Sequence, residues 1–130
     1  MRLHQSAFSP RAGSAAAVLG LARAGAGVAG LLAPRLAGRV MGLDAASAGS
    51  ARFVMRLFAT RDLALGLGTL AVSEPGERAR WLGMTAAIDA ADAAAALTAA
   101  ARGQIRRSSA YALAALATSA AAYGHAARRG

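Results

Sequence analysis

Four predominantly apolar segments follow one another along this chain of 130 residues, at residues 14–33, 50–72, 80–101 and 108–126. Each is close to the roughly 20 residues that a helix needs to cross about 30 Å of hydrocarbon. None shows the two-residue alternation that is typical of a strand. The sequence therefore predicts an all-α fold, in which residues 1–130 form one domain, a bundle of four transmembrane helices.

The connections between the segments carry ordinary helix-breaking signals. Pro34 ends the first segment, Ser73–Gly76 reads Ser-Glu-Pro-Gly and predicts a turn, and Gly103 follows the third segment. Residues 36–43, between the first two segments, are expected to form a brief amphipathic helix that lies at the membrane surface.

The composition is more typical of a membrane protein than of a soluble one. Hydrophobic residues make up 56% of the chain and charged residues 16%, against roughly 25% charged in soluble domains. Much of the apolar content is Ala, which buries little area in a soluble core. A soluble, Ala-rich four-helix bundle remains the alternative fold. It would require a charged face on each surface helix, and residues 108–124 contain no charged residue.

All fifteen basic residues are Arg, and the net charge is +9. Most of these arginines stand at the ends of the apolar segments rather than among aromatic residues, which argues against a nucleic-acid partner and indicates contact with membrane lipids. Arg52 and Arg56, one helical turn apart, are expected to extend toward lipid phosphates. Arginines divide evenly between the two sides of the predicted bundle, so the expectation of cytoplasmic termini rests only on how common that topology is.

Ionisable residues also occur near the middle of three of the four segments: Arg23, Arg61, Asp62, Asp89 and Asp92. A charge at the centre of a bilayer costs several kcal/mol unless it is paired or hydrated. Their common depth therefore predicts an intramembrane ion-pair cluster. Because it holds one aspartate more than arginines, a bound proton or cation would balance it.

Helical spacing predicts how the cluster pairs. Asp89 and Asp92, three residues apart, share a face, whereas adjacent Arg61 and Asp62 point about 100° apart and most easily serve different helices. We expect Arg61 to pair with Asp89 or Asp92, and Arg23 with Asp62 or the remaining aspartate. Arg23 lies on a stripe of glycines (Gly20, Gly27 and Gly30) that indicates close contact with another helix.

The run RLFATRDLALGLGTL (Arg56–Leu70), followed by IDAADA (Ile88–Ala93), resembles a family of small four-helix membrane proteins of unknown function that is frequent in actinobacteria. The family pattern is Arg-Leu-Phe-Gly-Ala-Arg-Asp/Glu-Leu with a later Asp-x-x-Asp, and here Ala59 and Thr60 replace Gly-Ala. There is a more distant similarity to the four-helix DoxX-like membrane proteins. The resemblance implies a fold and a membrane location but no activity.

Three functions fit these observations. The first is an assembly or accessory subunit, a homo-oligomer or part of a larger membrane complex, whose cluster is structural. The second is a membrane enzyme in which Asp89, Asp92 and Asp62 act as acid and base on a lipophilic small molecule. The third is a transport or proton-relay protein using the same aspartates. The first is preferred, because nothing in the sequence specifies a substrate.

No cofactor is expected. Cysteine is absent, which excludes disulfides and thiolate metal sites. His4 and His125 have no ligand-like neighbours in the sequence, so no metal site is expected either.

Overall fold

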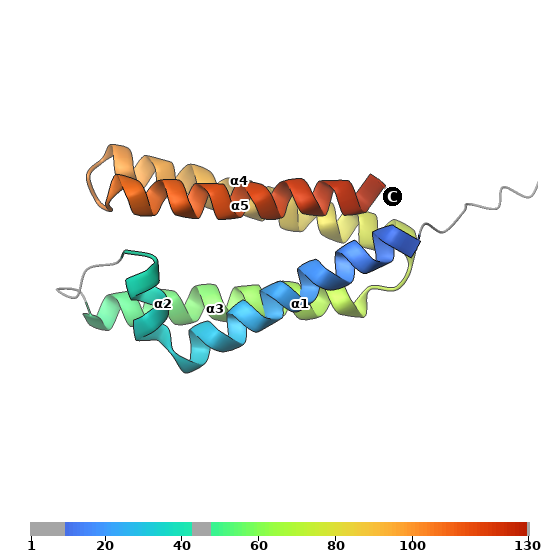
Figure 1. Cartoon of the computed structure of the whole chain (residues 1–130), viewed down its shortest axis with the longest axis horizontal. Coiled ribbons are helices and arrows are strands. Elements are labelled where there is room, and N and C mark those ends of the chain that lie inside the picture. Colours follow the sequence, from blue (N-terminus) through green and yellow to red (C-terminus); the bar gives the residue numbers. More distant parts are fainter. Residues whose placement is uncertain (1–9, 43–47, 130) are drawn as a thin grey trace, which may run out of the picture.

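The computed structural model describes residues 10–42 and 48–129, and every regular element within these ranges is a helix. Four long helices, α1 (Pro10–Leu32), α3 (Ala48–Ala71), α4 (Pro75–Ala101) and α5 (Arg107–Arg129), run alternately in opposite directions (Figure 1). The short helix α2 (Pro34–Val40) lies beside the start of α3. The all-α prediction is confirmed. His4 lies outside the described residues.

The helix ends follow from local sequence. Pro34 and Pro75 stand at the first positions of α2 and α4, where proline fixes φ and its missing N–H would be unpaired in any case. Ser73–Gly76 was predicted as a turn, yet the helix already begins at Pro75, because the Glu74 side chain accepts a hydrogen bond from the Glu77 amide and caps it. Gly103, with φ of +69°, makes the turn after α4.

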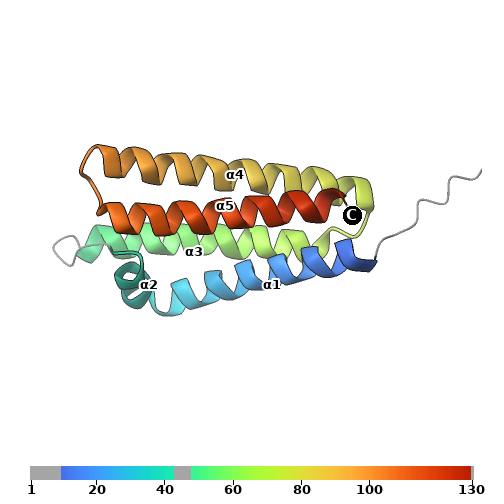
Figure 2. The same cartoon turned by 45° about the horizontal axis from the view of Figure 1, so that its top comes forward.

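The bundle is built from two helix pairs. α1 packs mainly against α3, and α4 against α5, while α1 also contacts α5. α3 and α4 are consecutive in the chain, yet their backbones make little contact. Figure 2 shows the four long helices side by side, with the start of α1 and the end of α5 at the same end of the bundle.

Glycines allow α1 and α3 to approach closely, as the glycine stripe predicted. A Cβ at Gly27 would lie 2.6 Å from the Leu63 nitrogen, and a Cβ at Gly66 would lie 2.5 Å from the Ala24 nitrogen. Both distances are far below van der Waals contact, so only glycine permits this spacing. Close backbone approach through small residues is how helices associate where lipid replaces water.

Two helices are long and apolar enough to cross a membrane, namely Gly13–Leu32 within α1 and Pro75–Ala101. The sequence predicted four such spans. α3 is interrupted by charged residues at Arg56, Arg61 and Asp62, and α5 dilutes its alanines with Ser, Thr, Tyr and His. Length and composition therefore identify one candidate span in each helix pair, rather than four independent ones.

Candidate functional site

The five mid-helix residues singled out by sequence come together at the junction of the two helix pairs. α1 supplies Arg23, α3 supplies Arg61 and Asp62, and α4 supplies Asp89 and Asp92. We refer to these five residues as the Arg–Asp network. α5 contributes none of them.

Arg23 lies at the buried end of the network. Its guanidinium donates to Asp89 through Nη2, and both residues are buried, at 7% and 4% exposure. Arg23 Nη1 also lies 3.7 Å from Asp62 Oδ1. A buried guanidinium is stabilised only if carboxylates compensate for the water it has lost, and here two carboxylates from two helices do so.

Arg61 forms the other end. Its Nη1 lies 2.6 Å from Asp92 Oδ2, and its Nη2 lies 3.3 Å from Asp62 Oδ1 on the same helix. The guanidinium carbon is also 4.9 Å from the centre of the Phe58 ring, within the range of a cation–π contact. Asp62 therefore stands between both arginines, and the order of contacts is Asp89, Arg23, Asp62, Arg61, Asp92.

The side chains of the network span the distance between helices whose backbones are not in close contact. α3 and α4 make little backbone contact, so the long side chain of Arg61 reaches across to Asp92, and Arg23 reaches from α1 to Asp89. A neutral contact between α3 and α4 assists them, because Trp81 Nε1 donates to Thr69 Oγ1 at 3.0 Å. The polar side chains thus join the two helix pairs.

Each predicted pairing is present within the alternatives stated above: Arg61 pairs with Asp92, and Arg23 pairs with both Asp89 and Asp62. The additional contact between neighbouring Arg61 and Asp62 was not predicted, since their directions differ along a helix. The contact between Trp81 and Thr69 was not predicted either. This hydrogen bond depends on how α3 and α4 are placed, which no local pattern reports.

Two donors in the network are unsatisfied. The Nε atoms of Arg23 and Arg61 are buried and lack a hydrogen-bond partner among the described residues. The network also has one carboxylate more than it has guanidinium groups. Within the described ranges, no group of three or more His, Asp or Glu side chains is arranged to hold a metal ion.

Comparisons with protein-family models, with curated proteins and with solved structures find no match to this chain.

Proposed function

We propose that this protein is a small multi-pass protein of the cell membrane, an assembly or accessory subunit whose Arg–Asp network fixes the helices and faces a further transmembrane helix. That helix belongs to a second copy of the chain or to a larger complex. In this proposal all four long helices cross the membrane, and both termini lie on the cytoplasmic side.

The distribution of side chains supports a membrane. Large apolar side chains point outward along the helices, including Leu21, Phe53 and Leu116 at 63%, 63% and 66% exposure, while Arg23 and Asp89 are buried. A soluble bundle would reverse this arrangement, since exposed apolar surface costs free energy in water and buried charge costs more. In hydrocarbon the same arrangement is favourable.

Helix pairing supports four spans. α3 and α5 are too polar to qualify by themselves, yet each packs along a helix that does qualify, α1 for α3 and α4 for α5. A charged span inserts at lower cost when its charge meets a partner on a neighbouring helix. Arg61 and Asp62, the most costly residues of α3, have such partners in Asp92 and Arg23.

The observation that carries the proposal is that one side of the network is open. The side chain of Asp89 is 6% exposed, but those of Arg61 and Asp92 are 31% and 30% exposed near the middle of their helices. A half-open ion pair in contact with lipid at that depth is costly. A further helix over this face would remove the cost, and such contacts are typical of assembled membrane subunits.

The enzyme and relay alternatives require a different environment for the same aspartates. An enzyme needs a cavity that ends on Asp89 or Asp92, and a relay needs a water path. One hollow among the described residues is lined by residues 32–36, Arg39, Arg52 and Arg56, and it lies apart from the network. We place the structural role first, because each arginine of the network already meets a carboxylate of the protein.

Cysteine substitution tests the proposal, since the chain has no native cysteine. Ala96 lies one turn after Asp92 on the network face, and Ala94 lies on the opposite, exposed face of α4. In native membranes, a cysteine at Ala96 should cross-link to another chain or be protected from both water-soluble and lipid-soluble maleimides. A cysteine at Ala94 should react with the lipid-soluble reagent.

The other outcomes decide against assembly. Reaction of the Ala96→Cys variant with the lipid-soluble maleimide alone would mean that the face contacts lipid. Reaction with the water-soluble maleimide would indicate a hydrated path and favour the relay. Release of the wild-type protein by alkaline carbonate would contradict the membrane location itself.

A further inference from the structure

A second group of arginines, distinct from the Arg–Asp network, gathers where α2 meets α3. Arg35 and Arg39 lie one turn apart on α2, and Arg52 and Arg56 lie one turn apart on α3. Together with residues 32–34 and Leu36 they line a hollow of about 520 Å³, a size typical of sites for small molecules. We refer to it as the arginine corner.

The corner is held in place by packing between the two helices. Gly38 of α2 is buried, and a Cβ there would lie 3.7 Å from Met55 of α3. Met55 is itself buried, at 5% exposure. Since Gly38 is flanked by Arg35 and Arg39, and Met55 by Arg52 and Arg56, this contact brings the two arginine pairs to one opening.

Three of the four arginines at the corner face no carboxylate of the described residues. None of the eight lining residues is acidic. Among the described residues, Arg35, Arg39 and Arg56 have no carboxylate within ion-pair distance, in contrast to Arg23 and Arg61. Several guanidinium groups around one hollow favour an anion, and their planar donor geometry matches phosphate oxygens.

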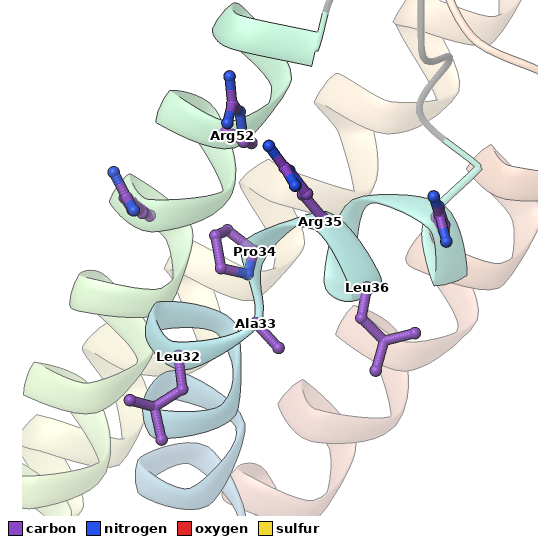
Figure 3. A pocket seen from close by; sticks show the side chains of 8 residues that line it. Leu32, Ala33, Pro34, Arg35, Leu36 and Arg52 are labelled. Carbon is purple, nitrogen blue, oxygen red and sulfur yellow. The ribbon is translucent and has the colours of Figure 1, made fainter.

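The walls of the hollow differ in polarity. In Figure 3 the guanidinium groups of Arg35 and Arg52 point to one side, and the side chains of Leu32 and Leu36 point to the other. Leu32 and Leu36 are 81% and 61% exposed. A ligand that fits both sides carries phosphate at one end and hydrocarbon at the other.

We propose that the arginine corner binds the phosphate headgroup of an anionic phospholipid, whose acyl chains lie along Leu32 and Leu36. The phosphate oxygens accept hydrogen bonds from the guanidinium groups of α2 and α3. The inference rests on the proposed membrane location, because only there does a lipid reach this surface. It is independent of whether the Arg–Asp network joins a partner helix.

Titration of lipids in a neutral detergent, followed by native mass spectrometry, tests this inference. The probes are phosphatidylglycerol and phosphatidylcholine with identical acyl chains, together with glycerol phosphate and inorganic phosphate as soluble sources of the same group. Phosphatidylglycerol should bind more tightly than the other three. Tighter or equal binding of a soluble phosphate would assign the corner to a free anion and overturn the lipid assignment.

Variants locate the site. Each arginine near an anionic lipid contributes roughly fivefold in affinity, so Arg35→Gln with Arg39→Gln should weaken phosphatidylglycerol binding about 30-fold. The matched control is Arg102→Gln with Arg107→Gln, which removes the same charge at the same end of the bundle, where α4 ends and α5 begins (Figure 1). An equal loss in the control would show that net charge alone attracts the lipid, and would overturn the inference.

Folding and location are checked separately. Arg35 and Arg39 are exposed, so the variants should keep the circular dichroism of the wild type, and Arg56→Gln provides a second test from α3. Release of the protein by carbonate would contradict the membrane proposal. Retention in the membrane without lipid selectivity would contradict only the arginine corner.

Discussion

Arginine occurs in two different settings in this bundle. In the Arg–Asp network, Arg23 and Arg61 lie near the middle of their helices and three aspartates face them. In the arginine corner, Arg35 and Arg39 lie near the end of the bundle, and among the described residues no acidic side chain lines the hollow around them. The same side chain therefore binds protein in one region and is available to an external anion in the other.

The difference follows from the solvent that each region would meet. In the membrane location proposed above, a guanidinium at mid-helix depth has no water or phosphate nearby, so a carboxylate of the protein must compensate its charge. In the same proposal, the end of a helix meets water and lipid headgroups, and the protein need not supply a partner there. Depth thus predicts whether an arginine contributes to folding or to surface recognition.

The largest expected difference between the regions is in stability. Arg23→Ala leaves the buried carboxylate of Asp89 uncompensated and should destabilise the protein by about 3–5 kcal/mol. Arg35→Ala should change the free energy of unfolding by less than about 0.5 kcal/mol, as is usual for exposed positions. Unfolding in detergent, followed by circular dichroism, measures both. Equal effects would remove the distinction drawn between network and corner.

The close approach of α1 and α3, which lets Arg23 reach the network, should be the next most sensitive feature. Gly66→Ala places a Cβ against the backbone of Ala24 and should cost about 1–3 kcal/mol. Gly25→Ala is the control, because nothing lies within 4 Å of a Cβ there, and it should stabilise α1 by about 0.5–1 kcal/mol. If both substitutions stabilise the protein, α1 and α3 are further apart than described.

A charge exchange refines the assignment of partners within the network. Arg61→Asp and Asp92→Arg should each lower the midpoint of thermal unfolding, because each places like charges together. The double variant should recover a coupling free energy of about 0.5–3 kcal/mol. Exchange of Arg35 with Asp92 provides a pair that makes no contact, for which the two effects should simply add. Additivity at Arg61 and Asp92 would mean that their ion pair contributes nothing.

The smallest expected effect is a change in stability with pH, and it concerns Glu74, which lies outside both regions. Backbone hydrogen bonds from the amides of Glu77 and Gly76 hold the pKa of Glu74 below its ordinary value of 4.5. The cap therefore contributes its full stability above pH 4.5 and loses it as the pH falls through the lowered pKa. Thermal unfolding of the wild type should show a slight additional loss below pH 4.5 that Glu74→Gln lacks. Glu77→Gln is the control in the same turn and should keep that loss.

Local sequence determined the helices and the inward face of α1. The period of 3.6 residues and the proline and glycine signals are properties of neighbouring residues, so they predicted all four long helices and placed Gly20, Gly27 and Arg23 on one stripe. The expected helix at 36–43 is present as Pro34–Val40, since Pro34 starts a helix as well as ending the one before it. The mid-helix positions of the five charged residues could also be read from the chain.

Only the tertiary structure decided which helices pair and which charges meet. Periodicity identifies an apolar or glycine-lined face but not the helix that covers it, so the pairing of α1 with α3, and the small contact between consecutive α3 and α4, could not be predicted. The choice of Asp92 for Arg61 follows from that packing. So does the arginine corner, because its two arginine pairs, separated in the chain, share one hollow only after Gly38 packs beside Met55.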